Sequence, residues 1–209
     1  MVELSEVLTE RMEKPDLYAI LSGEIPIVAK IGFDTGKIEL REESRTKTNM
    51  ILIKPGDLVI SGINAAKGAI AIYGAENTKP VAATIHYSSY MIDKEKADPV
   101  YLWYFFRSEV FRKILINNLP GGIKTEVKPK RLLPIRIPLP PLKEQKRTTA
   151  RVENLMVGVK EARRSRAKGA EEANVLLPSI FSKVISNSGA TFRQLNDLCL
   201  QITDGEHAT

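Results

Sequence analysis

Cysteine is nearly absent from this chain of 209 residues, and its only one, Cys199, excludes an internal disulfide framework. The sequence also has no signal peptide and no apolar run long enough to span a bilayer. Apolar residues still make up 43% of it, which is enough for a real hydrophobic core. We therefore expect a soluble, cytoplasmic protein with no membrane partner.

Catalytic motifs are scarce as well. The chain contains neither a phosphate-binding GxxxxGK[ST] motif nor a GxGxxG motif after a strand. Glu126 and Lys128 have the Glu-x-Lys spacing of many Mg²⁺-dependent nucleases, whose carboxylates hold the metal while the lysine polarises the attacked phosphate. Asp204, Glu206 and His207 stand at the chain end without a scaffold, so they favour no metal site. We predict no catalytic residue and no bound metal, with a Glu126/Lys128 nuclease as the alternative.

Positive charge is plentiful and unevenly distributed. The net charge is +6, and the sequence pI is about 9.3. One stretch has only Glu109 and Glu126 against eight basic residues: Arg107, Arg112, Lys113, Lys124, Lys128, Lys130, Arg131 and Arg136. Clustered positive charge is typical of a protein that binds a polyanion, although a basic stripe can also be a solvated face.

The first part of the chain has the pattern of a mixed α+β domain. A Lys54–Asp57 turn, with proline and glycine in its centre, separates two of the short β-branched runs. Asp98 and Pro99 predict the start of one helix that ends near Asn117 and carries an aromatic face for the core. The runs that predict strands are 25–31, 50–53, 58–60, 69–73 and 81–85.

Two loops of this domain are candidates for nucleic-acid contact. In Ser61–Gly68, Asn64 and Lys67 stand on a backbone of small residues that can approach another surface closely. Asparagine can pair with adenine, and lysine can contact guanine or phosphate. The second loop, 121–131, combines glycines with residues that can bind phosphates: Lys124, Thr125, Lys128, Lys130 and Arg131. A plain hairpin turn and a solubilising loop are the alternative interpretations.

A long helical pattern follows, from Leu142 to Ser186. Its apolar residues alternate spacings of four and three, which is a heptad seam that Arg163 and Arg166 interrupt. We expect the seam to pair with an antiparallel copy of itself or to dock on a partner subunit, and Pro178 to bend the helix or open its last turns. The predicted contact residues are Val152, Met156, Val159, Leu177, Ile180 and Val184.

The junction between the two parts carries a family resemblance. The sequence IPLPPLKEQ, Ile137–Gln145, followed by a basic helix, resembles the boundary between a target recognition domain and a conserved helix in DNA-specificity subunits of type I restriction-modification systems. The Pro-Gly-Asp turn with the strand and loop after it, and the tail from Gln194, are similar to other parts of those subunits. The resemblance implies a recognition domain (1–141), a spacer and dimerisation helix (142–186), and a linker with the start of a truncated second repeat (187–209).

The same resemblance implies a function. The chain would be a non-enzymatic subunit that recognises double-stranded DNA and directs a modification methyltransferase subunit to a bipartite target, with a restriction translocase subunit joining the complex. S-adenosylmethionine would bind to the methyltransferase, so the chain itself needs no cofactor. A full subunit has two recognition domains and two spacer helices, so we expect a homodimer of half-subunits. A coiled-coil scaffold without a DNA role is the second alternative.

Overall fold

The structure is a computed structural model, and the residues described are 1–43, 49–74, 77–119, 126–189, 191 and 193–199. Internal contacts divide the chain into two compact units, Met1–Glu153 and Asn154–Thr209. Helix α5 (Leu142–Asn187) runs across this division. The division predicted from the sequence, at residues 141 and 186, stays a prediction.

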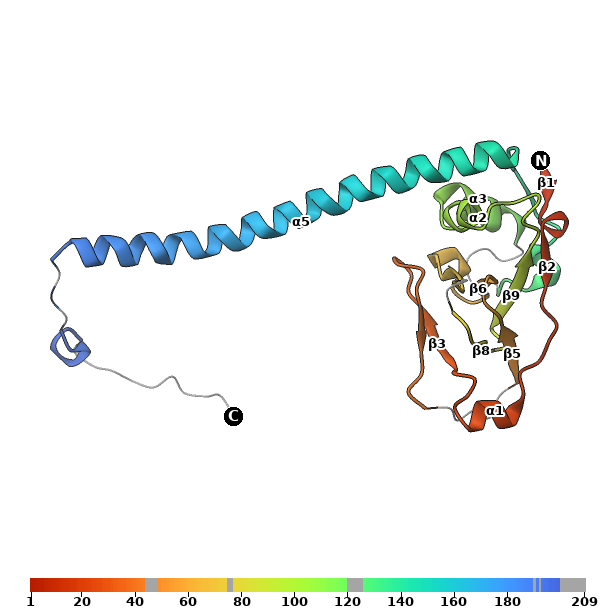
Figure 1. The fold of residues 1–209 in the computed structure, drawn as a ribbon, viewed down its shortest axis with the longest axis horizontal. Helices are drawn as coiled ribbons and strands as arrows, with labels where there is room; N and C mark the ends of the chain where they lie inside the picture. The colour runs from red at the N-terminus through yellow and green to blue at the C-terminus, as the bar shows by residue number, and fades with distance from the viewer. Residues whose placement is uncertain (44–48, 75–76, 120–125, 190, 192, 200–209) are drawn as a thin grey trace. The chain divides into compact units, whose positions relative to one another are not determined.

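The first unit is built on a four-stranded antiparallel sheet (Figure 1). Its strand order is β2 (Leu8–Glu10), β9 (Tyr87–Ile92), β6 (Leu58–Ser61) and β7 (Ile70–Ile72). Three two-stranded antiparallel pairs accompany it: β1 (Val2–Glu3) with β10 (Arg136–Ile137), β3 (Val28–Ile31) with β4 (Ile38–Leu40), and β5 (Met50–Ile53) with β8 (Val81–Thr84). Each of the five predicted strand segments overlaps an observed strand.

Short helices complete this unit, and the α+β prediction is confirmed. Helix α2 packs against β7 and lies next to α3 (Figure 1). The helices are α1 (Leu17–Leu21), α2 (Pro99–Phe106), α3 (Glu109–Asn118) and α4 (Pro129–Leu132), with 3-10 turns η1 (Leu4–Glu6) and η2 (Ala65–Lys67). In the second unit a further 3-10 turn, η4 (Leu195–Asp197), follows α5.

The single helix predicted after Asp98 is two helices, so that prediction is wrong in one respect. Ser108 ends the first and caps the second: its Oγ donates to the Phe105 carbonyl at 2.6 Å and accepts from the Phe111 amide at 3.2 Å. A serine side chain can satisfy backbone groups that a continuous helix would pair itself. Val110, in the first turn of the second helix, is 56% exposed.

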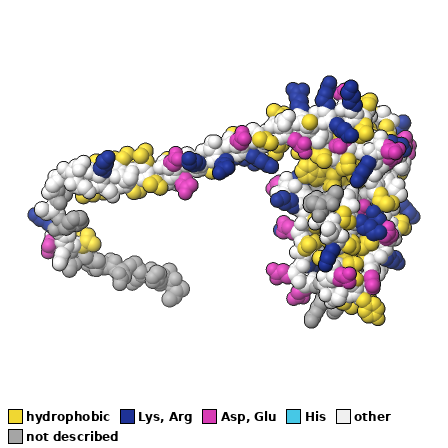
Figure 2. All heavy atoms as spheres, viewed as in Figure 1, with side chains coloured by type: hydrophobic (Ala, Val, Ile, Leu, Met, Phe, Trp, Pro, Cys, Tyr) yellow, Lys and Arg dark blue, Asp and Glu magenta, His cyan; other side chains and the backbone are white. Residues whose placement is uncertain are grey.

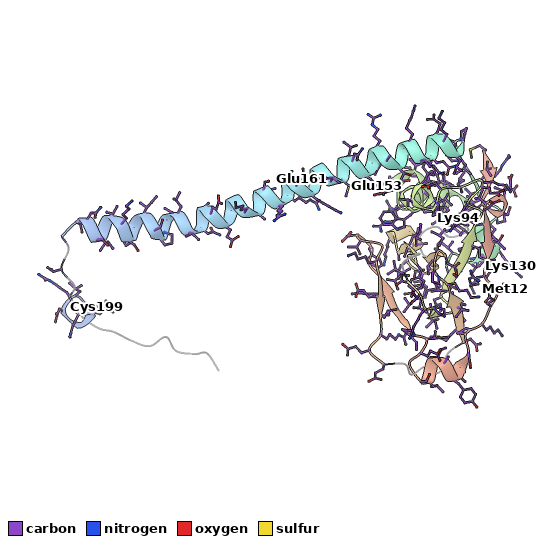
Figure 3. All side chains as sticks on the ribbon, viewed as in Figure 1. Met12, Lys94, Lys130, Glu153, Glu161 and Cys199 are labelled. Carbon is purple, nitrogen blue, oxygen red and sulfur yellow. The ribbon has the colours of Figure 1, made fainter. Side chains whose placement is uncertain are left out.

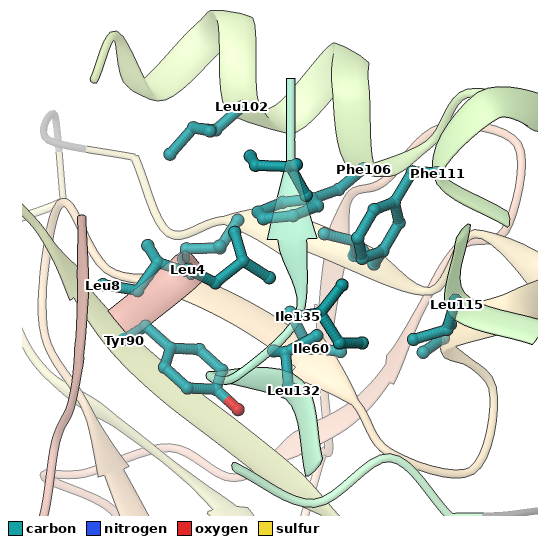
Figure 4. Packing of buried hydrophobic residues seen from close by; sticks show 14 of the residues in the cluster. Leu4, Leu8, Ile60, Tyr90, Leu102, Phe106, Phe111, Leu115, Leu132 and Ile135 are labelled. Atoms are coloured by element: carbon teal, nitrogen blue, oxygen red, sulfur yellow. The ribbon is translucent and has the colours of Figure 1, made fainter. Parts of the chain in front are cut away.

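Two aromatic residues of α2 and α3 belong to the core, as predicted, whereas Trp103 is only partly buried. Phe106 and Phe111 are buried and meet edge to face, with ring centroids 4.5 Å apart. Figure 4 shows them above Ile60 and Tyr90 of the sheet, with Leu4 beside them. This cluster holds the helices on the sheet and fixes the loops at the sheet's end.

The Lys54–Asp57 turn is present and is fastened by a buried carboxylate. Gly56 has a φ of +90°, which glycine adopts without strain, and the Asp57 amide donates to the Lys54 carbonyl at 3.0 Å. The Asp57 side chain accepts hydrogen bonds from Arg11 and from the Ser89 hydroxyl, the latter at 2.8 Å. The turn therefore links the exit of β2 to β9.

Gln145, the last residue of the IPLPPLKEQ junction, is completely buried and holds the junction on the first unit. Its Oε1 accepts from the Asp98 amide at 2.8 Å, and its Nε2 donates to the carbonyls of Lys96 at 3.0 Å and Pro140 at 2.8 Å. Thr149, one turn later, donates to Asp98 Oδ1 at 3.3 Å. Gln145 thus fixes the start of α5 to the start of α2.

Helix α5 continues past Pro178 to Asn187, so the predicted opening of its last turns is wrong. Proline removes only one backbone hydrogen-bond donor from the helix, and the residues of the neighbouring turns keep their donors.

None of the helices in the described parts of the chain combines the length and apolar character that crossing a membrane requires.

Candidate nucleic-acid interface

The loop between β6 and β7 is a short, anchored turn. Residues Ala65–Lys67 form the 3-10 turn η2, which ends at Gly68 with a φ of +88°. Ala65 is buried in the core, while Asn64 is partly exposed and Lys67 is exposed. The core thus holds this loop in place and leaves its two candidate DNA-contacting side chains accessible to solvent.

Three segments that are far apart in the sequence meet beside this loop, where β6 ends and β9 begins. The Val127 amide donates to the Gly62 carbonyl at 2.8 Å, and the Gly62 amide donates to the His86 carbonyl at 2.7 Å. A Cβ atom on Gly62 would lie only 2.9 Å from the Val127 carbonyl oxygen, so glycine permits this approach. The two candidate loops are therefore neighbours. Lys124 and Thr125 lie outside the described residues.

Glu126 lies at the centre of this meeting point. His86 Nδ1 donates to its Oε1 at 3.0 Å, and Lys128 Nζ is 3.4 Å from its Oε2. The hydrogen bond from His86, aided by Lys128, holds the pKa of Glu126 below its ordinary value of 4.5, against the effect of burial. Within the described residues, no group of three His, Cys, Asp or Glu side chains could hold a metal ion. Glu126 instead ties residues 126–131, the basic segment, to the turn between β8 and β9.

The basic segment itself contains helix α4. Leu132 is buried, and this anchors the helix while Lys128, Lys130 and Arg131 remain exposed. Lys130 lies near Glu10 and partly offsets the rise in the pKa of Glu10 that burial causes. Figure 3 labels Lys130 at the same edge of this unit as Met12. Residues 126–131, the described part of the predicted loop, therefore present three exposed cations.

The sequence interpretation missed three exposed residues at this place. His86 directly follows the predicted strand 81–85, and its side chain is 54% exposed. Ile63 and Ile85, which flank the Gly62–His86 hydrogen bond in the sequence, are 54% and 56% exposed. An isoleucine inside a predicted small-residue loop was the one signal that could have drawn attention to this surface.

The predicted seam of α5 is largely exposed in the single chain. Val152, in the first unit, is half-buried. Figure 2 shows hydrophobic side chains towards the C-terminal end of α5 and charged ones along its middle. The other seam residues have these exposed fractions: Met156 41%, Val159 42%, Leu177 75%, Ile180 49% and Val184 60%.

Comparison with known proteins gives these features a context. No known protein-family model matches the chain. The specificity subunit of the type I restriction enzyme MjaVIII from Methanocaldococcus jannaschii is 28% identical over 145 residues, which are 66% of this chain and 34% of that protein. Among solved structures, the HsdS subunit from Thermoanaerobacter tengcongensis has a TM-score of 0.66 at 24% identity, over 92% of this chain and 50% of its own. The chain resembles half of a type I specificity subunit.

A second solved chain agrees. It comes from a structural study of complex assembly and conformational transition in a type I restriction-modification system, and has a TM-score of 0.67 at 23% identity, again over 92% of this chain and 50% of that one. The resemblance predicted from Ile137–Gln145 is confirmed. The chain spans about a third of the curated specificity subunit and half of each solved chain.

Proposed function

We propose that this chain is a non-enzymatic DNA-recognition subunit that acts as half of a type I specificity subunit. The observation that carries the proposal is the hydrogen bond between Gly62 and Val127, which joins the two candidate loops on a fold similar to half of HsdS. Exposed cations and a small-residue turn at one end of a sheet suit the close approach of a nucleic acid.

The roles of the side chains follow from their chemistry. Asn64 and Lys67 project from η2 and its flank, where an amide or an ammonium group can read a base edge. The exposed cations Lys128, Lys130 and Arg131 contact backbone phosphates and set the orientation of the protein on the duplex. Lys124 and Thr125 belong to the same segment in sequence and are proposed to act with them.

The exposed seam supports a homodimer through antiparallel α5 helices. In one register, Val152, Met156 and Val159 of one copy face Val184, Ile180 and Leu177 of the other. In the same register, Arg163 faces Ala173 and Arg166 faces Ala170, so the arginines avoid each other. Such a pair has a closed two-fold interface. Two copies then supply two recognition domains, and their target is an interrupted palindrome of two half-sites.

The proposed partners follow from the similarity to type I specificity subunits. A modification methyltransferase subunit binds this chain and carries the S-adenosylmethionine, and a restriction translocase subunit completes the assembly. Purification of the chain from its host with its partners attached should yield a methyltransferase.

The salt dependence of DNA binding tests the interface. Replacing Lys128 and Arg131 by alanine should weaken binding to any duplex and flatten the plot of log Kobs against log salt by about 0.9 for each lost phosphate contact. The control replaces Lys30 and Lys143 by alanine, which removes the same amount of positive charge at positions outside the site. Equal slopes for the two double variants would refute the assignment of the basic segment. Asn64→Ala should change which bases are preferred more than it changes overall affinity.

A further inference from the structure

A second cationic site lies beside η2, in the first unit. It is a small, mostly polar pocket of about 160 Å³ between η2 and the junction of α2 with α3. The side chains that matter to its chemistry are Lys67, Arg107, Ser108, Glu109 and Arg112. Three of these five groups are cations and one is a carboxylate, so the pocket favours an anion.

The three cations are only weakly neutralised by the described residues. Arg107 Nη2 donates to the Phe33 and Asp34 carbonyls, and the Asp34 carboxylate offsets part of its charge. Its buried Nη1 has no hydrogen-bond partner among the described residues. Lys67 Nζ lies 5.8 Å from the centroid of the Phe33 ring and forms no ion pair with a described carboxylate. Its charge is therefore free to bind an anion.

Of the three cations, Arg112 has a charged hydrogen-bond partner, because its Nη1 donates a hydrogen bond to the Glu109 carboxylate at 3.2 Å. Both side chains are well exposed, 44% for Arg112 and 60% for Glu109, so water screens their attraction. The first turn of α3 supplies no anion site here, because Ser108 already caps it through the Phe111 amide.

The size of the pocket limits what it can hold. Its volume corresponds to about five water molecules at ~30 Å³ each, which admits a phosphate group but not a whole nucleotide. Small residues keep it open: a Cβ atom on Gly68 would lie 3.1 Å from the Phe33 carbonyl oxygen. Lys67 belongs both to this pocket and to the candidate base-reading loop.

We infer that this pocket holds a phosphodiester group of the DNA strand whose bases lie against Asn64. The inference rests on the proposed function and adds Arg107 and Arg112 to the interface. The loop between β6 and β7 then has cations at two places: Lys128 and Arg131 follow Val127, which pairs with Gly62, and Arg112 lines the pocket beside η2. Phosphate contacts at both places fix the register in which the loop meets the bases.

The test compares two neighbouring residues of α3 in the full chain. Binding to a labelled duplex of arbitrary sequence is followed by fluorescence anisotropy between 50 and 200 mM NaCl. Arg112→Ala should flatten the plot of log Kobs against log salt by about 0.9, whereas Lys113→Ala, an exposed neighbour that does not line the pocket, should leave it near the wild-type value. Glu109→Gln should tighten binding, because it frees Arg112 from its carboxylate partner. Circular dichroism checks that each variant is folded.

The outcomes separate this inference from the proposed function. Equal slopes for Arg112→Ala and Lys113→Ala, with wild-type DNA binding intact, overturn the inference alone. A wild-type chain that binds no duplex overturns both. Calorimetric titration with inorganic phosphate is the third measurement: phosphate binding that depends on Arg112, without any effect of Arg112 on the DNA slope, would make the pocket a site for free phosphate and contradict the DNA assignment.

Discussion

Replacing Gln145 by alanine tests how the IPLPPLKEQ junction holds helix α5 on the recognition domain. Gln145 is completely buried and pairs with three backbone groups, the Asp98 amide and the carbonyls of Lys96 and Pro140. Alanine can pair with none of them. The junction then loses the Gln145 hydrogen bonds between the start of α5 and the start of α2, while the Thr149–Asp98 hydrogen bond remains.

The magnitude follows from those three contacts. A buried polar group left without a partner costs about 1–3 kcal/mol. Lys96 is exposed and Pro140 half-buried, so water can reach their carbonyls, and the Asp98 amide bears most of the loss. Together with the volume that the shorter side chain leaves empty, we expect the free energy of unfolding of the first unit to fall by about 3 kcal/mol.

Urea denaturation measures this change through a built-in probe. Trp103 is the only tryptophan and lies on α2, whose first turn Asp98 caps, so its fluorescence reports on the affected helix. Lys146→Ala, an exposed position next to Gln145, is the control. The reasoning fails if the denaturation midpoint of Gln145→Ala matches that of the control.

Two further predictions concern charge and assembly. The pKa of Glu126 is lowered in the folded state, so its pairing with His86 and Lys128 stabilises the fold above the ordinary pKa of 4.5 and is lost as pH falls through the folded-state pKa. The stability difference between wild type and Glu126→Gln should therefore be present at pH 7 and disappear in acid; urea midpoints across a pH series that keep a constant difference would contradict this. Leu177→Glu with Ile180→Glu should give a monomer in light scattering, while Val175→Glu, exposed but outside the seam, should leave the dimer intact. A wild-type chain that is already monomeric at tens of micromolar would mean that the seam docks on the partner subunit.

The sequence predicts much of the fold where local pattern decides the structure. Short apolar runs such as Met50–Ile53 are strands, and Asp98 with Pro99 begins a helix. Strand β9 was missed because Ser88 and Ser89, both buried, interrupt its apolar pattern. The pair β1–β10 was missed because it joins two-residue segments from opposite ends of the domain, and only tertiary contacts select it.

The candidate site could be predicted in composition but not in arrangement. Residue type alone singles out Asn64 and Lys128, and their use in DNA binding remains a proposal. No local signal indicates that Gly62 pairs with both Val127 and His86, because that contact depends on the register of β6 with β9. The Arg112 pocket likewise depends on the break at Ser108, which the helical pattern concealed.

Selection from a pool of random DNA duplexes tests the central claim most directly. The full chain is immobilised, the bound duplexes are amplified through several rounds, and the enriched sequences are read. The account predicts an interrupted palindrome, with two inverted half-sites at a fixed spacing, and a changed half-site when Asn64 is replaced by alanine. A pool in which no sequence is enriched over the starting library would contradict the claim that this chain recognises DNA.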